Sequence, residues 1–126
     1  MNIETRIEKI QNPNEITYKR HCNCDVVIRD LSTCRTCKVI ENLIPAMDEV
    51  LEVVHYRKRK SLFYRTIIIG KRFSVDVQSG LGSGYDGSGP TGFYHVLYKL
   101  GFAEEIARIA YDRKHDNAVI TLKKII

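Results

Sequence analysis

The stretch FSVDVQSGLGSGYDGSGPTGFYHVL, residues 73–97, sets the pattern from which the fold of this chain is predicted. Its first part alternates apolar residues, from Phe73 to Val77, with polar ones, which predicts a strand with one buried face and one solvated face. Asp76 lies on the face that is expected to be solvated. The apolar run before it, residues 61–69, ends at Gly70-Lys71-Arg72, so the two strands are predicted to form a hairpin.

The rest of the chain supplies further strands and helices around one core. Its 126 residues suit one domain. The order of the elements predicts a single α+β domain, residues 1–126, with a mostly antiparallel sheet and two to three helices. Apolar residues at alternating or helical spacing give the bounds of each element. The expected elements are a hairpin within residues 3–20, helices at 39–47, 93–100 and 102–111, and strands at 50–56, 61–69, 73–78 and 118–126.

A glycine-rich loop, residues 79–92, joins the predicted strand to the predicted helix. Six of the eight glycines of the chain lie between Gly80 and Gly92, and glycine is used where the backbone needs positive φ or close approach to another group. Ser88 is expected to cap the helix, with Pro90 in its first turn. The free N–H groups of a helix start favour an anion.

The loop differs from the well-known phosphate loops. No lysine follows the glycines, which excludes a Walker A loop. The run Gly82-x-Gly84-x-x-Gly87 matches the dinucleotide fingerprint only formally, because the parallel βαβ unit that should flank it is missing. The alternative is a structural loop that binds nothing.

We therefore predict a site for a phosphate-bearing small molecule of the nucleotide type, bound without chemical change. Backbone N–H groups of the loop would hold the phosphate, aromatic rings would stack on the base and arginines would complete the pocket. The predicted ligand-binding residues are Phe73, Gly82, Ser83, Gly84, Tyr85, Asp86, Gly87, Ser88, Gly89, Thr91 and Phe93, with Arg57 and Arg108 as the cations.

Residues 64–98 resemble a pattern in small phage and prophage proteins, in which a β-hairpin leads into a Gly-Tyr-x-Gly-Ser-Gly-Pro loop that starts a helix. The matching loop runs from Gly84 to Pro90. A more distant resemblance is to phage proteins that sequester nucleotide immune signals, such as the Thoeris anti-defence proteins. These resemblances imply a phage protein that works in the cytoplasm of its host and sequesters an immune nucleotide signal. A homo-oligomer that shares its pocket between subunits is compatible with them.

The four cysteines form two close pairs, Cys22-x-Cys24 and Cys34-x-x-Cys37, within a predicted cysteine knuckle at residues 21–37. Two such pairs can supply the four thiolates of a tetrahedral structural zinc site, and His21 can replace one of them. Such a closed site leaves no open position for a substrate. The alternative is a set of buried or idle thiols.

The formal net charge is +5, which favours an anionic partner. The basic run Arg57-Lys58-Arg59-Lys60 is either a solvated turn between strands or a rim that faces phosphates. No paired carboxylates or activated nucleophile can be found, so we predict that the protein is not an enzyme. Two other functions stay open: a zinc-knuckle protein that binds nucleic acid, and a phage inhibitor that acts by protein–protein contact.

No apolar run approaches the roughly 20 residues that a membrane-spanning helix needs. The first residues, Met1-Asn2-Ile3-Glu4, carry an acid early and lack the apolar core of a secretory signal. The sequence therefore predicts a cytoplasmic protein without a membrane partner, in which cysteines are thiols or metal ligands rather than disulfides.

Overall fold

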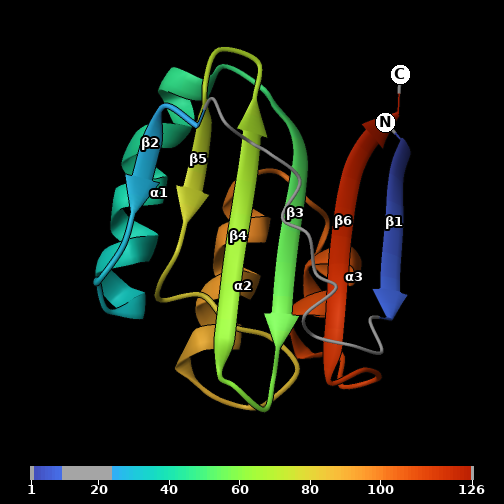
Figure 1. The fold of residues 1–126 in the computed structure, drawn as a ribbon. Coiled ribbons are helices and arrows are strands. Elements are labelled where there is room, and N and C mark those ends of the chain that lie inside the picture. The colour runs from blue at the N-terminus through green and yellow to red at the C-terminus, as the bar shows by residue number, and fades with distance from the viewer. Residues whose placement is uncertain (1, 10–23, 126) are drawn as a thin grey trace.

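A single six-stranded sheet organises the fold in the computed structural model, which describes residues 2–9 and 24–125 (Figure 1). The strand order is β1-β6-β3-β4-β5-β2, and every neighbouring pair is antiparallel except β2 with β5. The predicted α+β class with a mostly antiparallel sheet is confirmed. The strands are β1 (Asn2–Lys9), β2 (Val26–Ile28), β3 (Val50–Lys58), β4 (Phe63–Gly70), β5 (Ser74–Val77) and β6 (Asn117–Ile125).

The helices lie together on one face of this sheet, as Figure 1 shows. They are α1 (Thr33–Met47), α2 (Ser88–Lys99), the short α3 (Glu104–Ala107) and the 3₁₀ turn η2 (Arg108–Tyr111). Their buried residues join alternate strand positions such as Val53, Ile68 and Leu122 in one core. A second, smaller cluster of Val54, Tyr56 and Ile67 lies on the opposite face, because neighbouring strand residues point to opposite sides.

The hairpin formed by β4 and β5 is confirmed, with Ile68 opposite Val75. One detail of the prediction is wrong, because Asp76 is buried rather than solvated. Its carboxylate accepts two hydrogen bonds from Arg65, at 2.8 and 2.6 Å, and a third from the Gln78 side chain. A bidentate arginine is the partner that makes a buried carboxylate tolerable.

Helix α1 begins six residues earlier than predicted and takes in much of the expected cysteine knuckle. The Ser32 side chain accepts a hydrogen bond from the Arg35 backbone N–H, which caps the helix. Cys34 and Cys37 therefore lie in its first two turns. The knuckle prediction is wrong here because the buried Thr36 and Ile40 continue the apolar side of the helix toward its N-terminus.

Helix α2 follows the glycine loop as predicted, with Phe93, Val96 and Leu97 buried. The predicted cap is wrong: Gly87 is the N-cap residue and Ser88 the first helical one. Because glycine has no side chain, the first turn of α2 is left without a side-chain cap. The second predicted helix, 102–111, is an α-helical turn that tightens into a 3₁₀ turn.

The first strand, β1, is confirmed, but its partner is β6 at the far end of the sequence, with Thr5 opposite Leu122. The rest of the predicted N-terminal hairpin, including the turn at 12–14, lies outside the described residues. None of the helices within 24–125 has the length and apolar character that crossing a membrane requires.

Candidate ligand-binding site

The first half of the glycine loop is packed against the sheet rather than open to solvent. Leu81, Gly82, Ser83 and Gly84 are all buried. The backbone N–H of Gly84 donates to the carbonyl of Ala110, which ties the loop to the end of η2. Three predicted ligand-binding residues, Gly82, Ser83 and Gly84, are therefore placed inside the protein and not on a phosphate-facing surface.

Arg57 is the cation beneath this loop, and only 1% of its surface is exposed. Its guanidinium donates to the carbonyls of Asp112 and His115, at 2.8 and 2.6 Å, and to the Ser83 hydroxyl at 3.3 Å. Burial lowers the pKa of Arg57, and the two carbonyls replace part of the lost hydration. The prediction that Arg57 meets a ligand is wrong, because its guanidinium is occupied in joining β3, the loop and residues 112–115.

A buried row of polar groups lies beside Arg57. The two ring nitrogens of His55 lie 2.7 Å from the Thr66 hydroxyl and 2.8 Å from the Ser83 hydroxyl. All three side chains are fully buried. Burial, and then the charge of Arg57, lower the pKa of His55 to about 3, so the imidazole is neutral at ordinary pH and a weak base. A serine next to a histidine can be a nucleophile, but here the pair fastens the loop to the sheet.

Tyr85 fills the concave side of the loop with its own ring. A Cβ atom added at Gly82 or Gly89 would lie 2.8 or 2.5 Å from the Tyr85 hydroxyl, and one at Gly87 would lie 2.9 Å from the ring. Glycine at these positions makes room for a tyrosine of the same chain. The backbone approach that the sequence predicts is present, but the group that is approached is internal.

The two predicted phenylalanine contacts are also placed elsewhere. Phe93 is fully buried and its ring stacks on His55 with 4.2 Å between ring centroids, so the prediction that it stacks on a base is wrong. Phe73 packs against the main core just before β5. The loop begins after the other end of β5, so the strand separates Phe73 from the loop (Figure 1).

Of the cysteines that the structure describes, Cys34 and Cys37 lie one turn apart on α1, and Cys24 lies away from them. Cys37 packs into the core under the helices and its thiol lies 3.7 Å from the Gly92 carbonyl, whereas Cys24 packs with the cluster on the opposite face of the sheet. Burial raises the pKa of the Cys37 thiol, with the charge of Glu41 adding to it. Within residues 2–9 and 24–125, no group of three or more His, Cys, Asp or Glu side chains is placed to hold a metal. His21 and Cys22 lie outside that part, so the zinc site stays a prediction.

The basic run 57–60 is divided between the interior and the surface. Arg57 is buried, Lys58 lies over the Phe63 ring at 5.4 Å, and Arg59 pairs with Asp116 at 3.8 Å. Lys60 is exposed, whereas Lys58 and Arg59 are half-buried. The run is therefore not a continuous rim of cations.

The exposed end of the loop leads to a surface pocket. Asp86, Gly87, Ser88 and Thr91 are exposed at the start of α2, and Asp86 pairs with Arg113 at 2.6 Å. The Thr91 hydroxyl accepts a hydrogen bond from the Tyr111 hydroxyl at 3.1 Å. A pocket of about 410 Å³ follows one turn further along α2, lined by Tyr94, Glu104, Arg108 and Tyr111.

The pocket combines flat rings with one cation and one anion. The Tyr94 and Tyr111 rings are tilted against each other with 5.8 Å between centroids. Arg108 donates to Glu104 at 2.9 Å, and this hydrogen bond lowers the pKa of Glu104 and raises that of Arg108. Both groups are therefore charged at neutral pH. The pKa of Tyr94 is raised, by burial and by Glu104, so its phenol is neutral.

Of the residues in and beside this pocket, the sequence analysis names Thr91 and Arg108 but not Tyr94, Glu104 and Tyr111. Helical spacing is the signal that could have indicated Glu104 and Tyr94. Glu104 and Arg108 are four residues apart on one helical face, and Tyr94 is three residues after Thr91. The interior residues His55 and Thr66 left no signal, because they resemble polar residues on the solvated face of a strand.

The close approach of Gly84 to Arg57 generates the first prediction. Gly84 has φ +81°, and a Cβ there would lie 2.5 Å from the Arg57 guanidinium. We expect Gly84→Ala to lower the free energy of unfolding by at least about 2 kcal/mol, from the strained backbone and the displaced guanidinium. Gly101→Ala is the matched control, because Gly101 also has positive φ (+98°) but nothing within 4 Å of the added atom. Urea denaturation measures the free energy of unfolding of both variants. Equal losses of stability in the two variants would contradict the close packing of the loop on Arg57.

The low pKa of His55 generates the second prediction. His55 takes up a proton near pH 6.5 in the unfolded chain but only near pH 3 in the folded chain. The stability that neutral His55 contributes to the folded protein is therefore complete above pH 6.5, and it is lost as the pH falls from 6.5 toward 3. Lowering the pH from about 7.5 to 5.5 should therefore reduce the free energy of unfolding by about 1.4 kcal/mol through His55. Urea denaturation of the parent and of His55→Gln measures the difference in slope. NMR signals of the His55 ring that shift between pH 8 and 5 in the folded protein would contradict the burial.

Comparison with protein-family models, with curated protein sequences and with solved structures finds no match to this chain. The resemblance of residues 64–98 to phage proteins therefore stays a prediction, and the function is argued from the geometry of the site.

Proposed function

We propose that this protein binds a phosphate-bearing small molecule of the nucleotide type, without chemical change, in the pocket between α2 and the α3–η2 segment. The observation that carries the proposal is the lining of that pocket: two tyrosine rings and Arg108 around about 410 Å³. This volume is in the range of small-molecule sites. A base can stack on the tyrosines, since every base has a flat face, and Arg108 supplies a donor fork for phosphate.

The start of α2 extends this site toward the glycine loop. Thr91 is hydrogen bonded to Tyr111, which places the first turn of α2 against the pocket. That turn contains no acidic residue, and its N-cap is Gly87. A phosphate chain that leaves the tyrosines in this direction meets the positive end of the helix dipole. The exposed loop residues Asp86 to Ser88 thus keep a place in the proposed site, at its rim.

Glu104 restricts which ligands fit. Its carboxylate already accepts from Arg108 and lies beside the Tyr94 hydroxyl. A ligand phosphate must share Arg108 with it, whereas a base amino group or a ribose hydroxyl can donate to it. A nucleotide satisfies both groups; inorganic phosphate alone leaves Glu104 repelling it. We therefore propose a compact nucleotide, and immune nucleotide signals of the kind that phage proteins sequester are the first compounds to examine.

Removal of Arg108 tests the proposal. The protein is titrated with a panel of linear and cyclic mono- and dinucleotides, with binding measured by calorimetry and native mass spectrometry. Arg108→Ala should weaken the binding of a panel member at least about tenfold, which is the loss of one charge-assisted contact. Arg72→Ala is the matched control, because it removes the same charge from an exposed side chain in the β4–β5 turn; it should leave the affinity within about twofold.

Two results would contradict the proposal. One is that no nucleotide of the panel binds with a Kd below about 1 mM. The other is a nucleotide that binds Arg108→Ala and the parent protein equally well, which would place its site elsewhere.

A further inference from the structure

Among the residues that the structure describes, β1 has a strand on one side only, and its other edge carries a pattern that fits a second copy of itself. β1 stands at the end of the strand order, and within the described part of the chain only β6 pairs with it. An exposed strand edge presents unpaired backbone donors and acceptors that another strand can meet. We propose that two copies of this protein associate through antiparallel pairing of their β1 strands, with the two-fold axis passing beside Thr5.

The charged face of β1 supports this register. With the axis at Thr5, Glu4 of each copy stands opposite Arg6 of the other, so two cross-strand ion pairs form. Arg6 and Glu4 have 61% and 41% of their side chains exposed and pair within one strand at 2.9 Å. The same two charges are thus available to a partner on the surface of the edge strand. Opposite charges directly across two strands are stabilising and like charges are destabilising.

Other registers that keep the same faces together are less suitable. An axis at Arg6 places Arg6 of one copy opposite Arg6 of the other, and Glu4 opposite Glu8, so like charges face each other. An axis at Glu4 places Glu4 opposite itself. An axis at Ile7 pairs Arg6 with Glu8 but leaves Ile3 and Glu4 opposite residues beyond the end of β1 at Lys9. Only the axis at Thr5 combines opposite charges with pairing along nearly the whole strand.

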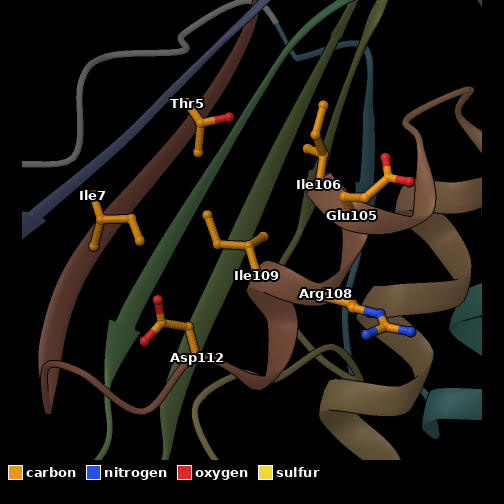
Figure 2. Close-up of a pocket in the computed structure, with 7 residues that line it drawn as sticks. All are labelled: Thr5, Ile7, Glu105, Ile106, Arg108, Ile109 and Asp112. Atoms are coloured by element: carbon orange, nitrogen blue, oxygen red, sulfur yellow. The ribbon is translucent and has the colours of Figure 1, made fainter.

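The helix-facing side of β1 is complementary in the same register. Ile3 of one copy stands opposite Ile7 of the other, twice. Ile7 and Thr5 line a pocket of about 350 Å³ whose other wall carries Ile106 and Ile109 together with the charged residues Glu105, Arg108 and Asp112. Figure 2 shows the β1 side chains and Ile109 bordering this space. Ile3 of the second copy would therefore arrive at the edge of this pocket, next to Ile7.

The pairing makes one continuous sheet from two six-stranded ones, with the helices of both copies on one face. Such a two-fold interface is isologous, so it closes at the dimer and does not propagate. The paired β1 residues do not line the ligand pocket between α2 and η2, although Arg108 borders both that pocket and the one beside β1. The inference does not rest on the proposed function.

Charge exchange across the axis tests the dimer. Arg6→Glu gives four facing acids and Glu4→Arg gives four facing bases, so each variant alone should dissociate, with the Kd raised at least about tenfold. An equimolar mixture of the two variants restores both ion pairs and should form a heterodimer. Sedimentation velocity and native mass spectrometry at about 100 μM follow the masses, and circular dichroism shows that each variant is folded.

Cross-linking provides a second measurement that needs no charge reversal. Directly opposed strand residues have Cβ atoms about 5 Å apart, which a disulfide can join after a small adjustment. Thr5→Cys should form a dimer linked through position 5 on both chains, identified by peptide mapping after mild oxidation. Ile7→Cys is the control, since it faces Ile3 and should not link to itself.

The inference is overturned if the parent protein is monomeric at about 100 μM. It is also overturned if both single variants remain dimeric, because the interface then lies elsewhere. A cross-link through position 7 instead of position 5 would contradict the register.

Discussion

Burial of the Arg57 guanidinium is the constraint on which the region around the loop depends. A charge removed from water needs acceptors at close range, and Arg57 obtains them from Ser83 and from the carbonyls of Asp112 and His115. These groups come from the loop and from the segment after η2, so one side chain fixes both against the sheet. Gly84 lies against the guanidinium with positive φ, which explains why the loop is rich in glycine at this point.

The packed interior of the loop determines which part of it stays at the surface. Tyr85 fills the concave side, and the hydroxyl–imidazole–hydroxyl row through His55 fastens the underside to β3 and β4. What remains exposed is the last part of the loop and the first turn of α2. This part leads to the pocket with its tyrosine pair, so the glycine residues would position the proposed site rather than form it. In this arrangement the rigid sheet supports the loop, and the loop sets the start of α2.

The charged residues follow two different rules in this fold. Arg65 and Asp76 form a bidentate pair, and the terminal nitrogens of Arg57 donate to backbone carbonyls. The charges of β1, in contrast, lie on an exposed edge, where a single ion pair contributes little to stability because water screens it. Charges at such an edge act on the choice of partner, since they favour one register over the others.

The sequence by itself determined the local elements: alternation predicted β5, the run 61–69 before the turn at Gly70 predicted β4, helical spacing predicted α2, and the glycine run located the bend between β5 and α2. These patterns record which face of a segment is apolar, and that is a property of neighbouring residues. The tertiary structure alone decided that Arg57 is buried, that β1 pairs with β6, and that Cys24 and Cys37 lie on opposite faces of the sheet. The acceptor of Arg57 at Asp112 is 55 positions away. Only the path of the whole chain brings such groups together, so no local pattern reports them, and the same holds for the pocket that joins Tyr94 to Arg108 and Tyr111.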